Sequence, residues 1–113
     1  MRKTYKVIIS FEAEQNVDEA YLWIAQSNER EALRWYEGII DAMRSLAKLP
    51  LRCPLSPETE LGLVDQKVHQ LLYGNGHWKY RILYTVDGDE VRIAHVRHGA
   101  RLLLGQSETE TDE

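Results

Sequence analysis

Two side chains in the C-terminal third of this 113-residue chain, Arg81 and His98, have types and positions that suit chemistry on a phosphate. Arg81 stands in the middle of a strand-like segment, and a guanidinium held by a sheet can donate two parallel hydrogen bonds to a phosphate while staying cationic. His98 ends the next such segment, and imidazole is the side chain best suited to proton transfer near pH 7. Three further cations support the pair: Lys79, Arg97 and Arg101. The alternative is that all of these are ordinary surface charges on an exposed sheet face.

Charge is distributed unevenly along the chain, which has a formal net charge of −4. Residues 67–101 hold six Lys and Arg against three Asp and Glu, together with all four histidines. Residues 102–113 hold four acidic residues and no basic one. The acidic total would argue against a polyanionic partner, but its distribution leaves the C-terminal third basic. A net charge of plus 3 over residues 67–101 is modest for a nucleic-acid-binding protein, so it limits that interpretation without excluding it.

Cysteine content and hydropathy exclude several classes of protein. Cys53 is the only cysteine, which rules out an internal disulfide and a Cys-ligated zinc module. Its expected role is that of a small apolar filler. No apolar run approaches the roughly 18–20 residues that a membrane-spanning helix needs, and the N-terminus lacks the apolar core of a signal peptide. The sequence therefore predicts a soluble cytoplasmic protein with no membrane association.

The pattern of apolar residues predicts two helices and four strands. Ser10 and Asn28 are candidate N-caps, and Pro50 is expected to stop the second helix. The order predicts an α+β domain over residues 1–105, in which a helical hairpin packs on one face of a mainly antiparallel four-stranded sheet (β-α-α-β-β-β). An acidic, flexible tail is expected at 106–113. The expected strands are 4–10, 68–73, 78–86 and 90–98, and a Pro-marked loop is expected at 51–65.

Asp87-Gly88 is a hairpin signal that sets the predicted register of the last two strands. With these residues at the centre of the turn, Val86 pairs with Asp89 and Tyr80 with His95. A bulge or a three-residue loop would exchange the faces of one strand. The predicted core face, covered by the helices, holds Trp78, Tyr80, Ile82, Tyr84, Val86, Val91, Ile93 and His95. The opposite face is predicted to be basic and open and holds Lys79, Arg81, Leu83, Thr85, Arg92, Ala94, Val96 and His98.

The spacing His95-x-x-His98 is that of a metal-ligand pair, but the predicted strand argues against a metal site. An odd separation in a strand directs the two rings to opposite faces, so they cannot bind one ion, and no cofactor is expected. His95 is expected to be a hydrogen-bonded core histidine beside Tyr80. His98 shares the predicted open face with Arg81, about 13 Å away along the strands at about 3.3 Å per residue. The two side chains can bracket a phosphodiester, and direct contact would need a bulge.

The last two strands carry a family resemblance. The segments YRILY (80–84), DGD (87–89) and VRIAHVRHGAR (91–101) together resemble the C-terminal signature of the RelE/ParE toxins of type II toxin-antitoxin systems, to which plasmid stabilisation proteins belong. The order of elements is also similar to that family, so the resemblance covers about residues 4–101. It implies a small cytoplasmic bacterial toxin that is neutralised by a cognate antitoxin protein, with which it can form a hetero-oligomer.

The resemblance implies two possible activities. RelE-like toxins are endoribonucleases that cleave mRNA without a metal, commonly in the ribosome, by attack of a ribose 2′-hydroxyl on the adjacent phosphate. In that case Arg81 would stabilise the transition state, His98 would act as acid or base, and the other cations would bind backbone phosphates. ParE-like toxins instead inhibit DNA gyrase by protein binding. The endoribonuclease is our first hypothesis. RelE-like RNases are generally basic, whereas this chain without its acidic tail is neutral. Gyrase inhibition and an inactive interaction module therefore remain as alternatives.

Overall fold

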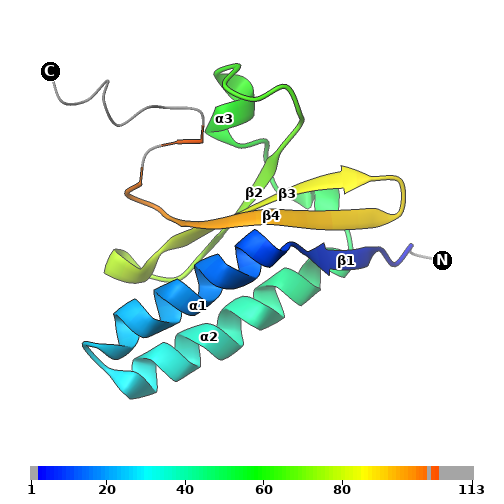
Figure 1. The fold of residues 1–113 in the computed structure, drawn as a ribbon. Coiled ribbons are helices and arrows are strands. Elements are labelled where there is room, and N and C mark those ends of the chain that lie inside the picture. The colour runs from blue at the N-terminus through cyan, green and yellow to red at the C-terminus, as the bar shows by residue number, and fades with distance from the viewer. Residues whose placement is uncertain (1–2, 102, 105–113) are drawn as a thin grey trace, which may run out of the picture.

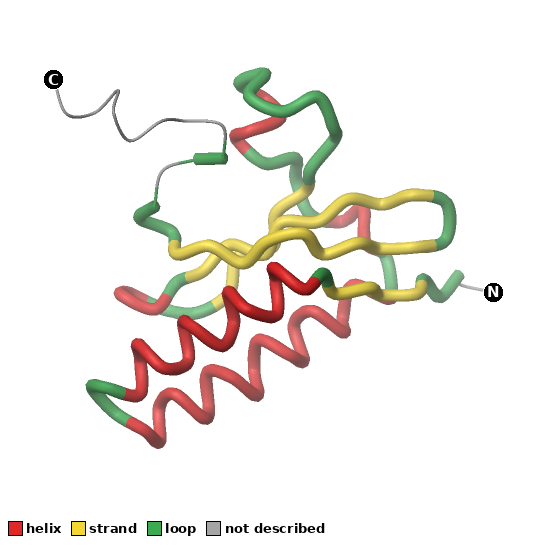
Figure 2. Tube along the Cα trace, in the orientation of Figure 1, coloured by secondary structure: helices red, strands yellow, loops and turns green. Residues whose placement is uncertain are grey.

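The computed structural model describes residues 3–101 and 103–104, and its fold is the predicted α+β arrangement (Figure 1). Two long helices lie on one face of a four-stranded sheet, in the order β-α-α-β-β-β (Figures 1 and 2). The predicted tail at 106–113 lies outside the described residues. None of the described helices is long and apolar enough to span a membrane. The elements are β1 (Lys6–Ile9), α1 (Phe11–Ala25), α2 (Glu29–Arg44), a short α3 (Pro57–Glu60), β2 (His69–Tyr73), β3 (Tyr80–Asp87) and β4 (Glu90–His98).

The helical hairpin begins at the predicted capping residues. The side chains of Ser10 and Asn28 each accept a hydrogen bond, at 3.0 Å, from the backbone N–H three residues further on. Helix α2 ends at Arg44, earlier than predicted; a 3₁₀ turn over Ser45–Ala47 follows, and Pro50 begins a second such turn. The helices bury one apolar stripe each, formed by Ala13, Val17, Ala20 and Ile24 of α1 and by Ala32, Trp35, Ile39 and Met43 of α2.

The sheet is mixed, with the strand order β1-β4-β3-β2. Strand β1 runs parallel to β4, and the other neighbouring strands are antiparallel. Because β1 is short, the chain leaves the sheet at Ser10 and α1 continues along the edge of β4. Ser10 Oγ donates to the carbonyl of Ala94 at 2.9 Å, and Asn16 Oδ1 accepts from the N–H of Val96 at 3.0 Å. These bonds tie α1 to the part of β4 that β1 does not reach.

The β3–β4 turn is displaced by one residue from the prediction. Its last strand pair is Asp87 with Glu90, so Gly88 and Asp89 occupy the centre of the turn. Gly88 has φ of +62°, in the left-handed region that glycine enters without a steric penalty. The predicted pairings of these strands are therefore wrong, although the hairpin itself is present.

A bulge in β4 has a larger effect on the predicted faces. Tyr84 pairs with Ile93, but its neighbour Leu83 pairs with His95, so Ala94 lies opposite neither residue. An extra residue in one strand reverses the alternation of every side chain beyond it. The part of β4 that follows Ala94 consequently presents its side chains to the faces opposite to those predicted.

The sheet face opposite α1 and α2 is covered around Arg81 and Leu83, so the prediction that this part is open is wrong, whereas Arg92 near the β3–β4 turn is exposed as predicted. The loop between α2 and β2, with α3 in it, lies over this face (Figures 1 and 2). Leu83 is fully buried there and Arg81 is 6% exposed. The N–H of Gln70 donates to the carbonyl of Pro54 at 3.0 Å, which fastens the loop to β2. Cys53, in the same loop, is buried in the core, as a small apolar filler would be.

Candidate functional site

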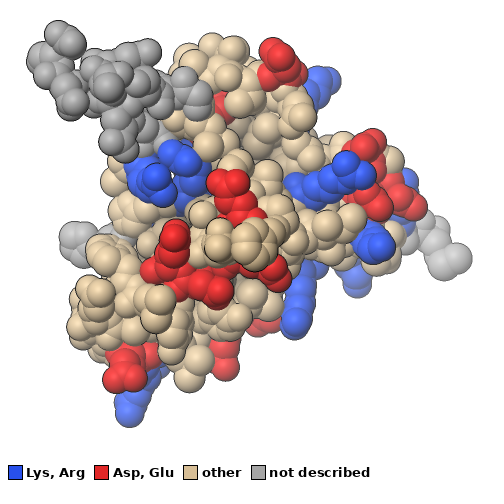
Figure 3. All heavy atoms as spheres, in the orientation of Figure 1, with Lys and Arg blue, Asp and Glu red and all other residues tan. Residues whose placement is uncertain are grey.

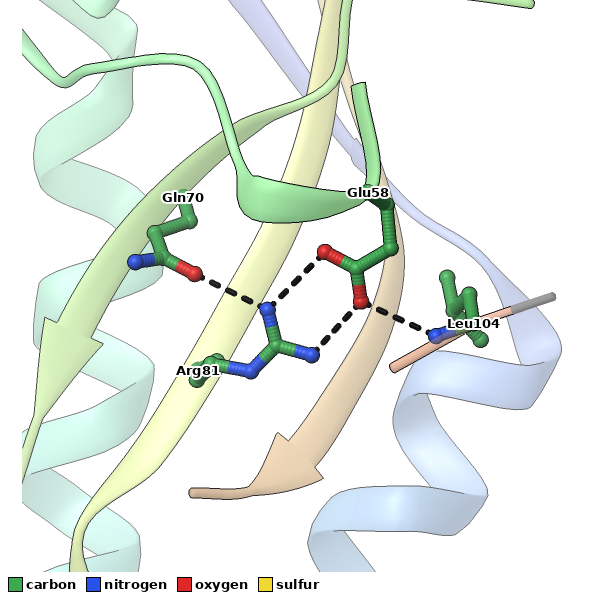
Figure 4. Close-up of polar contacts among 4 residues, drawn as sticks. All are labelled: Glu58, Gln70, Arg81 and Leu104. Carbon is green, nitrogen blue, oxygen red and sulfur yellow. Dashed lines mark hydrogen bonds and ion pairs between the residues drawn. The ribbon is translucent and has the colours of Figure 1, made fainter. Parts of the chain in front are cut away.

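Arg81 is buried at the centre of the covered face, where Glu58 of α3 binds it at two points (Figure 4). Its Nη1 donates to Glu58 Oε1 at 3.0 Å and its Nη2 to Glu58 Oε2 at 2.7 Å. Nη1 also donates to Gln70 Oε1 at 2.9 Å. The N–H of Leu104 donates to Glu58 Oε2 at 3.0 Å, so the same carboxylate also holds the end of the described chain. The guanidinium and the carboxylate therefore satisfy each other inside the protein.

Glu58 is ionised in this network. Burial raises its pKa, but the hydrogen bonds from Arg81 and from the N–H of Leu104 outweigh burial and lower the pKa from 4.5 to about 2. The buried cation thus faces a buried anion at neutral pH. A phosphate could reach the same guanidinium nitrogens only by displacing Glu58.

His98 lies on the helix side of the sheet, so the prediction that it shares a face with Arg81 is wrong. The bulge pairs His98 with Tyr80, whose ring centroid is 5.1 Å away. Trp23 of α1 also contacts the imidazole edge to face, at 5.8 Å between centroids. The Nδ1 atom accepts a hydrogen bond from the N–H of Ala100 at 3.1 Å. His98 is therefore held among aromatic rings at the edge of the molecule rather than beside the buried arginine.

His95, rather than His98, lies on the same face of the sheet as Leu83 and Arg81. It pairs with Leu83, and its Nδ1 lies 3.2 Å from Glu12 Oε2. The prediction of a core histidine beside Tyr80 is wrong, again because of the bulge. The prediction that His95 and His98 point to opposite faces is confirmed. Within residues 3–101 and 103–104, no three His, Cys, Asp or Glu side chains are grouped so that they could hold a metal ion.

Of the remaining predicted cations, Arg97 and Arg101 lie near the end of β4, and Lys79 precedes β3. Arg97 pairs with Arg81 across the two strands. Burial, and the charges of Arg101 and Arg81, lower the pKa of Arg97. Lys79 and Arg101 are exposed. Figure 3 shows a basic group of side chains beside an acidic group on one face of the molecule. A polar cleft of about 360 Å³ separates the two groups and is lined by Glu12, Asn16, Glu19, His95, Arg97 and Arg101, among others.

A second, smaller cleft adjoins the first and contains His98. It has a volume of about 140 Å³, and its lining includes Trp23, Tyr80, His98 and Arg101. Of the five predicted site residues, the structure thus brings His98 and Arg101 together, places Arg97 beside Arg81, and separates Arg81 from His98.

Glu58 is the residue of this region that the sequence analysis missed. It lies in the Pro-marked loop, where no periodicity marks a residue as buried. The available signal was Arg81 itself, because a charged residue in the middle of an apolar strand needs a partner of opposite charge when it is buried. The sequence gives no means of choosing Glu58 over the other carboxylates.

The sequence of the chain matches a known family of toxins. The model of the family described as the ParE toxin of the type II toxin-antitoxin system, parDE, matches residues 7–103. The chain belongs to this family, which confirms the resemblance seen in its last two strands. Family membership implies a cognate antitoxin as its partner.

Comparison with solved structures supports the same fold. A chain from the chromosomal ParDE TA system from P. aeruginosa is similar over 85% of this chain and 97% of that chain, with a TM-score of 0.67 and 15% sequence identity. At that identity the likeness concerns the fold alone. A search of curated protein sequences found no match.

Proposed function

We propose that this toxin inhibits DNA gyrase by protein binding, the activity of the ParE-like branch, rather than by cleaving RNA. The observation that carries the proposal is the buried pair of Arg81 and Glu58. Transition-state stabilisation of phosphate transfer requires donors aimed at the reacting oxygens, and those of Arg81 are aimed at a carboxylate. Removing the partner of a buried charge costs about 3–5 kcal/mol, so a substrate phosphate would have to overcome that penalty to use Arg81.

The separation of Arg81 and His98 supports the same proposal. An acid or base must lie within hydrogen-bond reach of the proton it transfers, and the two side chains point to opposite faces of the sheet. Inhibition by binding needs no such pair. The inhibitor would act in the cytoplasm, where its antitoxin and gyrase are both present.

RNA cleavage is the second candidate, favoured by the cleft beside Trp23. His98 and Arg101 both line this cleft, and a half-exposed Trp23 ring offers a surface on which a base can stack. In this candidate His98 is the acid or base, and Arg97, Arg101 and Lys79 bind phosphates. Arg81 would then support the sheet without touching the substrate.

Controlled expression in cells separates the two candidates. Gyrase inhibition predicts growth arrest with induction of the DNA-damage response, intact transcripts, and retained toxicity of His98→Ala. RNA cleavage predicts early loss of transcripts that His98→Ala prevents. Growth arrest with cut transcripts and no DNA-damage response would overturn the proposal. Gln106→Ala, in the tail outside the described residues, serves as an expression control.

A further inference from the structure

Leu49 joins the two short turns that follow α2, and its backbone conformation is unfavourable for leucine. It has φ of 50° and ψ of 53°, in the left-handed region, and within residues 3–101 and 103–104 it is the one residue other than glycine with a positive φ. A Cβ atom in this region comes too close to a backbone carbonyl oxygen, a cost that glycine avoids and asparagine partly offsets by local hydrogen bonding. Pro50, which follows, keeps Leu49 out of the helical region. The fold itself would therefore be more stable with glycine or asparagine at position 49.

The side chains on either side of Pro50 are apolar and exposed. Leu49 is 53% exposed and Leu51 is 63% exposed, and we call these two side chains the leucine patch. Pro50 between them is fully buried, and its carbonyl accepts a hydrogen bond at 2.6 Å from the hydroxyl group of the buried Tyr84. The backbone of the patch is thus attached to the core while its two side chains are left at the surface.

Arg52 fixes the shape of the turn that carries the patch. Its Nη1 donates to the carbonyls of Lys48 and Leu49, at 2.7 and 3.2 Å, and its Nη2 donates to Ser45 Oγ at 3.0 Å. Because these bonds already order the turn in the free protein, binding through the patch would lose little conformational entropy.

The surroundings of the leucine patch are cationic. Residues 44–52 include Arg44, Lys48 and Arg52, all of them exposed, and no acidic residue. A partner surface that takes up the two leucines is therefore expected to be apolar at its centre and acidic around it. A second copy of this chain does not fit that description, because a two-fold contact would place the patch against itself and bring the three cations of each copy together.

Strain and exposure coincide at this patch. Isolated exposed leucines are ordinary, but a leucine that is both strained and exposed lowers the stability of the free protein in two ways. Strained residues are concentrated at sites of binding and catalysis. A rigid pair of apolar side chains offers no group for acid–base chemistry, but it can anchor a contact with another protein.

We propose that the leucine patch is the contact by which this toxin binds DNA gyrase, with Leu49 and Leu51 entering an apolar depression of the enzyme and the cations beside them lying against acidic residues at its rim. The inference rests on the proposed function, since it names the surface that inhibition by binding requires. Neither Arg81, which is buried, nor His98, which lines another cleft, takes part in this contact.

The variant Leu49→Asn separates binding from folding. It removes the apolar side chain, and asparagine enters the left-handed region more easily than leucine does, so the melting temperature should equal or exceed that of the wild type. Leu51→Gln removes the second apolar side chain. Leu22→Gln of α1 is the matched control, because Leu22 is also 63% exposed. Lys48→Glu reverses one of the charges beside the patch.

The measurement is inhibition of supercoiling by purified gyrase, together with calorimetric titration of gyrase with each variant. We expect Leu49→Asn and Leu51→Gln each to raise the half-inhibitory concentration and the Kd by at least about fivefold. Lys48→Glu should raise both by at least about threefold, and more at low ionic strength, because salt screens exposed charges. Leu22→Gln should stay within about twofold of wild type. Weaker binding by Leu49→Asn without a lower melting temperature is a result that a purely structural role of Leu49 does not produce.

The outcomes distinguish this inference from the proposed function. Inhibition by the wild type, with an unchanged Kd for both leucine variants, would overturn the inference and leave the proposed function standing. A wild-type chain that neither binds nor inhibits gyrase would overturn both. Weaker binding of the leucine variants to the antitoxin that is produced with this toxin, with gyrase inhibition unchanged, would assign the patch to the antitoxin instead. Self-association of the chain alone that Leu51→Gln abolishes, again with gyrase inhibition unchanged, would assign the patch to a second copy, and either result would overturn the inference.

Discussion

Arg81 on β3 and Glu58 on α3 form a two-point ion pair, with N–O distances of 3.0 and 2.7 Å, on the sheet face opposite α1 and α2. Both side chains are buried, with 6% of Arg81 and none of Glu58 exposed. The pair joins the central strand to the Pro-marked loop, and the N–H of Leu104 extends the connection to the C-terminal segment (Figure 4). The guanidinium that the sequence predicts to bind phosphate therefore fastens the Pro-marked loop to the sheet.

Removal of one partner of this pair should destabilise the protein strongly. Arg81→Met leaves the Glu58 carboxylate buried without its cation, and we expect the free energy of unfolding to fall by about 3–5 kcal/mol. The double variant Arg81→Met/Glu58→Met removes both charges and should recover most of that loss, because apolar side chains of similar size can replace a buried ion pair. Urea denaturation of the two variants and the wild type measures both effects. Equal stability of wild type and Arg81→Met would contradict the assigned role.

Acid should weaken the same pair. The pKa of Glu58 is lowered from 4.5 to about 2 in the folded protein, so the unfolded chain takes up this proton first as the pH falls. The stability contributed by Glu58 is complete above the unfolded pKa of 4.5 and is lost as the pH falls toward 2. Glu58→Gln cannot take up the proton, so the stability difference between wild type and Glu58→Gln should shrink across that range. A difference that is independent of pH would count against an ionised Glu58.

The bond between Asn16 and β4 offers a test of how α1 is attached. Asn16→Ala leaves the N–H of Val96, a buried residue, without its acceptor at 3.0 Å, and we expect a loss of about 1–3 kcal/mol. Asn16→Asp keeps an acceptor of the same length and should lose less. Thermal unfolding of the two variants provides the comparison. If Asn16→Asp is as destabilised as Asn16→Ala, the bond does not account for the loss.

Replacement of His98 separates packing from catalysis. His98→Ala removes the ring between Trp23 and Tyr80, and edge-to-face aromatic contacts contribute about 0.5–1.5 kcal/mol each. Stability should therefore fall by about that much while growth inhibition persists. His98→Phe keeps an aromatic ring but no titratable nitrogen, and it is the matched control. Toxicity that both variants lose while they stay folded would support the RNA-cleavage candidate instead.

Local signals in the sequence were sufficient to predict the main helices and strands but not to predict which residues meet at the candidate site. Ser10 and Asn28 cap helices because their side chains satisfy nearby backbone N–H groups, which is a short-range effect that spacing reveals. The bulge at Ala94 has no such local sequence signal. It depends on how β4 pairs with β3 and on the hydrogen bond from Ser10, at the start of α1, to the carbonyl of Ala94. It moved His98 away from Arg81. The pairing of Arg81 with Glu58, 23 positions away, depends on how the loop packs.

The most direct test of the proposed activity uses purified gyrase and supercoiled plasmid. We predict that the wild-type chain and the folded Arg81→Met/Glu58→Met variant both inhibit supercoiling, while an mRNA incubated with either protein, with and without ribosomes, stays intact. Gyrase that supercoils normally in the presence of the toxin, together with mRNA that either protein cuts, would contradict the account.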